Sequence, residues 1–196
     1  MSESTYNAIV AELIAAVPLN ALGPGTPDQS KLPLLEQLST EAVVAPRVPR
    51  DRDAAACCCA GLWLRYDFLD QSHRISQDVD SEDGSYWHGL MHRREGDFGN
   101  AKYWFRRVGA HPVFSELCAE AAKLAEAEMD KAPPSSPIRN EAGFLTGQAA
   151  WDVSRFIDLC ERVTGSGSDL EMLCREIQRR EWDLLFDFCY RKASAV

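Results

Sequence analysis

His88 and His92 are the residues of this chain whose type and spacing best suit chemistry. They stand four positions apart in YWHGLMHRREG, so on a helix both imidazoles project from one face, one turn apart. Two histidines at this spacing can share one divalent metal ion, as they do in helical zinc sites. The position after His88 is Gly89 and not the glutamate that a metalloprotease uses as its general base, so the pattern excludes that class of enzyme.

A metal site on this face needs further ligands. Glu95 follows His92 by three positions and points the same way on a helical wheel. His111 lies at the start of the next predicted helix and His73 in the stretch before this one, so either of them could return to the site as a third ligand. The alternative is that these histidines donate hydrogen bonds to core carbonyls or carboxylates and serve structure only.

A carboxylate far along the chain, Glu181, is another candidate metal ligand. It falls near the middle of an apolar arc in the C-terminal helical segment. A carboxylate that faces a core must be paired, protonated or bound to a cation, because desolvating its charge is costly. If Glu181 meets the face of His88 and His92, it acts as a metal ligand or accepts an imidazole N–H. The alternative is an ion pair with an arginine such as Arg65 or Arg155.

Basic charge gathers in the same region. Residues 85–111 carry five Lys or Arg against two Asp or Glu, a local charge of +3, whereas the rest of the chain carries 16 against 28, a charge of −12. Such a face suits an anionic ligand, either a small phosphate or carboxylate or an acidic protein segment. The alternative is pairing with the protein's own carboxylates. The candidate anion-binding residues are Arg93, Arg94, Lys102, Arg106 and Arg107.

The overall charge and hydropathy exclude several classes of partner. A net charge of −9 disfavours nucleic acid and anionic membrane surfaces as partners. The sequence has no window of 18 consecutive apolar residues, so no membrane-spanning helix is predicted. The N-terminal apolar stretch lacks a positive flank and carries Glu3 and Glu12, which predicts a cytoplasmic protein. The seven cysteines form no C-x-x-C pair, so we expect them to pack as small buried hydrophobes.

The elements that must position these residues all show helical spacing. The fold predicted is all-α, a single-domain bundle of about seven helices with a tight central hairpin. We expect an N-terminal helix and Pro/Gly-rich arm over 1–52 and a helical core domain over 53–196. The polar stretch 71–85 is expected to be mostly loop. The predicted helices span 4–17, 54–69, 84–95, 98–109, 112–131, 149–164 and 169–192, with a further short one within 33–44.

The stretch GDFGNAKYWFRRV resembles the second half of a tetratricopeptide unit. Gly96 and Asp97 stand at the turn, Ala101 and Phe105 follow four apart, and Gly89 matches a small position of the first helix. In that family small residues let two helices pack closely, and stacked repeats form a peptide-binding groove. The neighbouring segments show no such self-similarity, so the resemblance implies a tight helical hairpin rather than a repeat array.

The phrase WHGLMHRREGDFGNAKYWFRRVGAHPVF, together with REWDLLFDFCYRKA near the C-terminus, resembles a group of uncharacterised bacterial proteins over most of the chain from about residue 50. The resemblance implies a family and no activity. No G-x-S-x-G elbow or phosphate-cradling loop is present, so whether the protein is an enzyme stays open. The function expected first is binding of a divalent metal or a small anionic ligand at the 86–111 hairpin. The alternatives are a protein-interaction module and purely structural histidines.

Overall fold

Helices make up all of the regular structure in the residues that the computed structural model describes, 6–15 and 19–194. The predicted all-α class is confirmed. The described helices are more numerous than the seven expected, because several short ones join the long ones. In chain order they are α1 (Ala8–Ala15), α2 (Leu32–Leu35), the 3-10 turn η1 (Ala42–Val44), α3 (Arg52–Arg65), α4 (Leu69–Gln77), α5 (Glu82–Glu95), α6 (Phe98–Val108), α7 (Val113–Lys131), α8 (Pro137–Glu141), α9 (Gly143–Gly147), α10 (Val153–Val163) and α11 (Asp169–Ser194).

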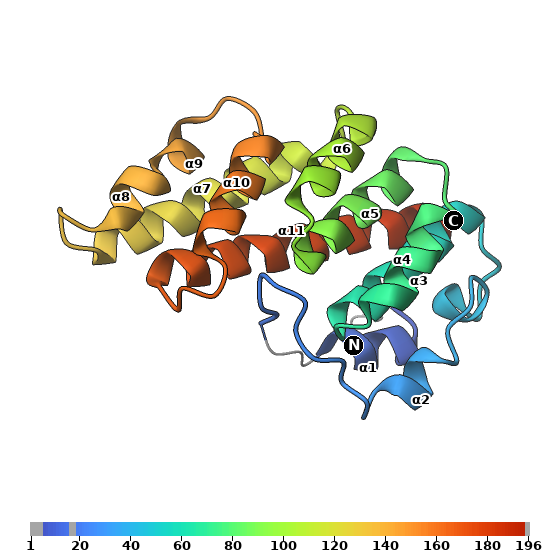
Figure 1. Ribbon diagram of the computed structural model, residues 1–196. Helices are drawn as coiled ribbons and strands as arrows, with labels where there is room; N and C mark the ends of the chain where they lie inside the picture. Colours follow the sequence, from blue (N-terminus) through green and yellow to red (C-terminus); the bar gives the residue numbers. More distant parts are fainter. Residues whose placement is uncertain (1–5, 16–18, 195–196) are drawn as a thin grey trace, which may run out of the picture.

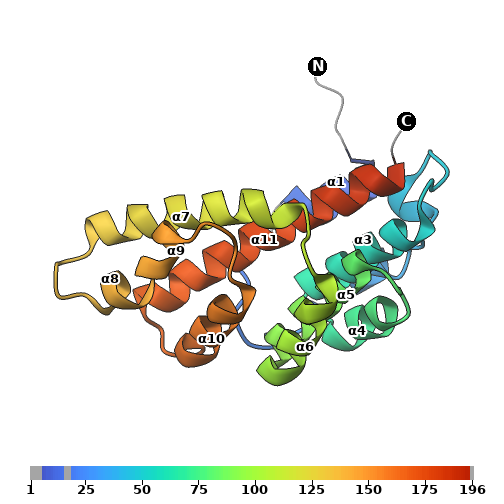
Figure 2. The ribbon, with the colours of Figure 1, turned by 90° about the horizontal axis from the view of Figure 1, so that it is seen from above.

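The long helix α11 is the axis of the molecule. Figures 1 and 2 show it running from the end formed by α7–α10 to the end formed by α1 and α3. It is buried on more than one side, as a helix inside a core must be. Its apolar arc, predicted from the spacing of the sequence, therefore packs against α7 and α10 in its first half and against α3 in its second.

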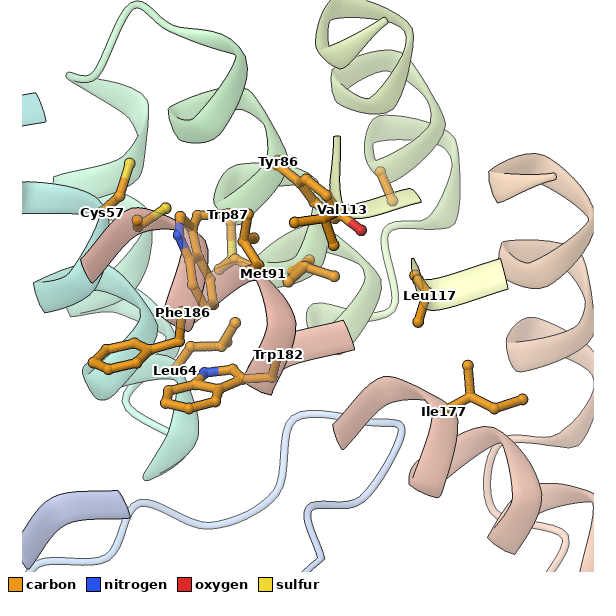
Figure 3. Close-up of a cluster of buried hydrophobic side chains, with 14 of the residues drawn as sticks. Cys57, Leu64, Tyr86, Trp87, Met91, Val113, Leu117, Ile177, Trp182 and Phe186 are labelled. Atoms are coloured by element: carbon orange, nitrogen blue, oxygen red, sulfur yellow. The ribbon is translucent and has the colours of Figure 1, made fainter. Parts of the chain in front are cut away.

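The helix α3 packs against α11, α4 and α5 through small side chains. Cys57, Ala54, Ala55 and Ala60 are fully buried. Gly61 leaves room for the indole of Trp87, which a Cβ at Gly61 would approach to 2.6 Å. Trp182 of α11 donates its indole N–H to the Gly61 carbonyl at 2.9 Å. Figure 3 shows Cys57, Trp87 and Trp182 together in this core. In the sequence, the alanines and small cysteines predict close packing of this helix, and Asp53 is its expected N-cap. The N-cap observed is Asp51, whose side chain accepts from the Ala54 backbone N–H.

The N-terminal region contributes side chains to the same hydrophobic core. Val10 and Leu13 of α1, Leu35 of α2 and Val44 of η1 are all buried there. The hydroxyl of Tyr66 donates to the Leu13 carbonyl at 2.7 Å, which ties α1 to the end of α3. The sequence suggests Ser4 or Thr5 as the N-cap of the first helix, and both residues lie outside the part of the chain that the structure describes.

The hairpin of α5 and α6 is as tight as the sequence predicts. Gly96 takes a φ of +90° at the C-terminus of α5, a conformation that favours glycine, and Asp97 caps α6 by accepting from the Asn100 amide N–H. A Cβ at Gly89 would lie 2.9 Å from the ring of Phe105. The two helices therefore approach through a glycine seam, as the resemblance to a tetratricopeptide hairpin implies.

The loop predicted at 71–85 is wrong over its first half, where the chain forms α4. Ser72 and Ser76, one turn apart, are fully buried and let α4 pack closely between α3 and α5. Leu69 and Ile75 pack against the core beside them. A helix with a polar composition and a seam of small serines lacks the apolar stripe that the prediction relied on.

Candidate metal centre

Three histidines from two neighbouring helices meet at one point. His73 comes from α4, and His88 and His92 come from successive turns of α5. One ligand nitrogen from each lies within 4.8 Å of the others, and the Nε2 atoms of His88 and His92 are 2.9 Å apart. His88 and His92 are buried and His73 is half-buried, so the cluster meets the solvent at its His73 edge.

A carboxylate on the outer side of His92 sets the orientation of its ring. Glu95 Oε2 lies 3.0 Å from His92 Nδ1, and since a carboxylate only accepts, Nδ1 carries the proton and donates it. The neutral ring then presents the Nε2 lone pair to the centre of the cluster, toward Nε2 of His88 and the side-chain amide of Asn100. This carboxylate–histidine arrangement is the one that orients metal-binding imidazoles in proteins.

The surroundings keep the buried imidazoles neutral. Burial, together with the nearby imidazoles of His92 and His73, lowers the pKa of His88 from 6.5 to about 3. Burial also lowers the pKa of His92, although its hydrogen bond with Glu95 opposes the shift. Neutral imidazoles offer the lone pairs that a metal ion needs.

The ring of Trp104 from α6 closes one side of the cluster. It stacks on His88 with ring centroids 4.0 Å apart and an interplanar angle of 19°, while His73 meets His88 edge-on at 4.7 Å. Stacking fixes the plane of the His88 ring and thereby the direction of its nitrogens. The site is therefore built from three helices, α4, α5 and α6.

The spacing of the three nitrogens is close to what a metal ion requires. Zinc–nitrogen bonds of about 2.0–2.1 Å at tetrahedral angles place ligand nitrogens about 3.3 Å apart. The Nε2 atoms of His88 and His92 are 2.9 Å apart, and no two of the three ligand nitrogens are more than 4.8 Å apart. Small side-chain rotations would therefore bring all three nitrogens to the spacing that the ion requires. Three nitrogen ligands leave a fourth position for water or a small ligand.

Two predicted ligands lie elsewhere. Glu181 is fully buried, but its carboxylate binds Arg93 at 2.5 Å and the hydroxyl of Tyr86 at 3.0 Å, not the histidines. The sequence is right that Glu181 must be paired and wrong about the partner. Of the alternatives, the ion pair is the one observed, with Arg93 in place of Arg65 or Arg155.

His111 is also held away from the cluster. Its Nε2 lies 2.9 Å from Asp83 Oδ1, and its Nδ1 accepts the backbone N–H of Val113 at 3.2 Å. Both ring nitrogens are thus used in fixing the start of α7 to the start of α5. Of the two further histidines that the sequence offers, the structure brings His73 to the site and not His111.

The candidate anion-binding residues do not form one site. Arg93 pairs with Glu181, Arg94 with Asp67 at 2.6 Å, and Lys102 with Asp158. This internal pairing is the alternative that the sequence left open, and for these three residues it is the one observed.

The other two anion-binding candidates lie on the outer face of α6. Arg106 and Arg107 are exposed, and their guanidinium groups lie over the rings of Tyr103 and Trp104. Arg107 also lies 3.3 Å from Asp80, a contact open to solvent.

Asn100 is the site residue that sequence reasoning misses. Its side-chain nitrogen lies 3.0 Å from His92 Nε2, because the third residue of α6 faces back across the hairpin toward the last turn of α5. The sequence feature that could have pointed to Asn100 is the tight connection at Gly96 and Asp97, because it brings the first turn of α6 beside the last turn of α5.

A comparison of the chain with protein-family models, with curated proteins and with solved structures finds no match. The resemblance to a bacterial group therefore stays a prediction. None of the described helices is long and apolar enough to cross a membrane. The geometry of the three histidines is what bears on function.

Proposed function

We propose that the protein binds one divalent transition-metal ion through His73, His88 and His92. The observation that carries the proposal is the convergence of three imidazole nitrogens within 4.8 Å of one another. Imidazole suits zinc, copper, nickel and iron, and among these zinc best accepts three nitrogen ligands with one open position. The low pKa values of His88 and His92 support it, because protons do not compete for these lone pairs near neutral pH.

Metal binding would require one tautomeric change. In the hydrogen bond between the two Nε2 atoms His88 donates, since His92 holds its own proton on Nδ1 toward Glu95. On binding, the proton of His88 moves to its Nδ1, and the Nε2 lone pairs of both rings face the ion. The ion would enter from the side of His73, the half-buried member of the three. An ion with three histidine ligands and one open position acts as a Lewis acid or acidifies a bound water.

The test is zinc binding by the full chain after dialysis against a chelator. Isothermal titration with zinc chloride is expected to give one site, and saturating zinc is expected to raise the thermal midpoint. At free zinc about 1000-fold above the Kd the gain in stability is about 4 kcal/mol. The variant H73N removes a half-buried ligand with little effect on the core and is expected to abolish binding.

The matched control is H111Q, which alters the histidine held by Asp83 and Val113. It is expected to bind zinc as the wild type does, whatever its effect on stability. A wild-type protein that binds less than a tenth of an equivalent of zinc, copper, nickel and iron, with a midpoint indifferent to each, would show that the histidines are structural.

A second candidate function rests on the outer face of α6. Tyr103 is 47% exposed, and the exposed guanidinium groups of Arg106 and Arg107 lie beside it and Trp104. Such a basic, aromatic surface suits an acidic protein segment. Fluorescence anisotropy with a labelled glutamate-rich peptide is expected to show binding that the R106E/R107E variant loses. Equal affinity of the two proteins would exclude this surface.

A further inference from the structure

One face of α6 lies against the two histidines of α5. Figure 2 shows α4, α5 and α6 as neighbours, and α5 packs against both of the others. Asn100 and Trp104 stand four positions apart on α6, so both project from the same face. The side-chain nitrogen of Asn100 lies 3.0 Å from His92 Nε2, and the indole of Trp104 stacks on His88. Asn100 therefore brings a polar group directly to one of the proposed metal ligands.

The Nε2 atom of His92 faces more hydrogen-bond donors than it can satisfy. A neutral imidazole accepts through one nitrogen only, the one that carries no proton. In His92 this nitrogen is Nε2, because Glu95 accepts the proton on Nδ1. His88 Nε2 lies 2.9 Å from it and the amide nitrogen of Asn100 lies 3.0 Å from it. Two donors thus share one lone pair.

The side chain of Asn100 depends on that lone pair. Within the described part of the chain, its nitrogen has hydrogen-bond contacts only with the ring of His92, at 3.0 Å to Nε2 and 3.4 Å to Nδ1. Nδ1 carries its own proton and does not accept. When an ion takes the lone pair on Nε2, the N–H group of Asn100 loses its acceptor, and a new one must come from outside the imidazoles.

The fourth position of the ion lies within reach of Asn100. In tetrahedral geometry a fourth ligand atom is about 3.3 Å from His92 Nε2. The nitrogen of Asn100 is 3.0 Å from the same atom, so a side-chain rotation brings its N–H group beside that ligand. Asn100 and His73 are half-buried, whereas His88 and His92 are buried. A ligand that comes from the solvent therefore meets the ion on the side of His73 and Asn100.

We propose that the fourth position of the ion takes a small oxyanion, either a carboxylate or an inorganic oxyanion such as bicarbonate, and that Asn100 donates a hydrogen bond to it. This role rests on the metal binding proposed above. A divalent ion held by three neutral imidazoles keeps a net positive charge even beside the exposed carboxylate of Glu95, which favours an anion. An oxyanion offers one oxygen to the ion and another to Asn100, whereas chloride offers a single atom to both.

The test uses the full chain loaded with one equivalent of cobalt(II), whose visible absorption responds to its fourth ligand. Acetate, bicarbonate and chloride are titrated separately at one ionic strength. At least one of the two oxyanions is expected to change the spectrum with a Kd of about 10 mM or below, and to bind about tenfold or more tightly than chloride. A response to acetate alone assigns a carboxylate ligand, and a response to bicarbonate alone assigns an inorganic oxyanion. Equal affinity for chloride and both oxyanions would overturn the proposal.

The variant N100A isolates the hydrogen bond from the metal. It is expected to bind cobalt(II) as the wild type does and to hold the oxyanion about tenfold or more weakly, because a charge-assisted hydrogen bond is lost. The matched control is N140A, which alters an exposed asparagine in α8. It is expected to hold the oxyanion like the wild type.

The outcomes separate the ligand from the metal site. A wild-type protein that binds no cobalt(II) would exclude the metal site and the oxyanion together. If cobalt(II) binds and the variants N100A and N140A hold the oxyanion alike, the metal site stands and the role of Asn100 is excluded. Loss of cobalt(II) binding in N100A alone would make Asn100 a ligand of the ion itself, which also overturns its proposed contact with an oxyanion.

Discussion

Glu181 of α11 and Arg93 of α5 form an ion pair in which both side chains are buried, with Oε2 2.5 Å from Nη2. The hydroxyl of Tyr86 completes the carboxylate's hydrogen bonds at 3.0 Å. This pair joins the hairpin helix that carries two of the three histidines to the central helix of the fold. It explains why an acidic residue stands in the middle of an apolar arc.

Removal of one partner is expected to be costly. E181A leaves Arg93 charged and unpaired in the core, which destabilises the protein by about 3–5 kcal/mol. The double variant R93M/E181L replaces the pair by apolar side chains and is expected to recover most of that loss. Urea unfolding of the three proteins measures the difference. A double variant as unstable as E181A would mean that packing, and not the unpaired charge, determines the cost.

The pH dependence of stability follows from His88. Its pKa is about 3 in the folded protein and near 6.5 in the unfolded chain, so below pH 6.5 the unfolded state binds more protons. Stability is therefore expected to fall as the pH falls from 6.5 toward 3, by at most about 1.4 kcal/mol per pH unit from this group. Urea unfolding at pH 7, 6 and 5 in the presence of chelator measures it.

The comparison with H88Q isolates this contribution from that of the buried carboxylates. The pKa of Asp83 is lowered by its hydrogen bonds to His111 and Lys192, against the effect of burial, so Asp83 also loses stability in acid, in both proteins. H88Q is expected to show a shallower slope between pH 6.5 and 5. Parallel slopes would mean that His88 titrates normally.

The sequence predicts the relative placement of the candidate residues correctly where they lie on one helix. The spacing of His88 and His92 fixes their common face, and Glu95 follows on it. The sequence does not predict which residues of different helices meet, because that depends on which helices pack together. His73 comes from α4, a helix that the sequence does not predict because its buried face is made of serines and not of apolar residues. Asn100 comes from α6, across the hairpin.

The same lack of information about contacts between helices explains why the sequence assigned Glu181 to the metal ligands and the buried arginines to an anion site. A helical wheel shows that Glu181 faces the core, but not that Arg93, rather than a histidine, lies opposite. Arg94 is charged and yet buried, because the segment 19–24 covers it and accepts hydrogen bonds from its guanidinium group. Irregular segments carry no periodicity, so the residues that they cover cannot be found from spacing.

The glycine seam of the hairpin gives a matched pair of substitutions. G89A places a methyl group 2.9 Å from the ring of Phe105, and the strain is expected to cost about 1–3 kcal/mol. G99A, in α6 with its nearest atom at 3.8 Å, meets no obstacle and is expected to gain about 0.5–1 kcal/mol from helix propensity. Thermal unfolding of both variants measures the difference. Equal midpoints would mean that the helices separate freely.

Six of the seven cysteines are buried and are expected to be unreactive in the native protein. Burial raises the pKa of Cys59 to about 12, and burial also raises that of Cys58, so neither forms a thiolate near neutral pH. Cys118 is the half-buried one of the seven. Titration with a thiol reagent is expected to show one accessible thiol before unfolding and seven after it. In C118S the accessible thiol is expected to disappear. Fast reaction that persists in C118S would mean that the reagent reaches one of the buried cysteines in the native protein.

The carboxylate behind His92 offers the sharpest test of the metal centre short of removing a ligand. E95Q keeps the size of the side chain but loses the charge that fixes the Nδ1–H tautomer of His92. Zinc affinity is expected to fall about 10- to 100-fold, with the stoichiometry unchanged. The control E82Q alters an exposed glutamate in the first turn of the same helix. If both variants bind zinc alike, Glu95 does not orient a ligand, and His92 either binds the ion unaided or does not bind it.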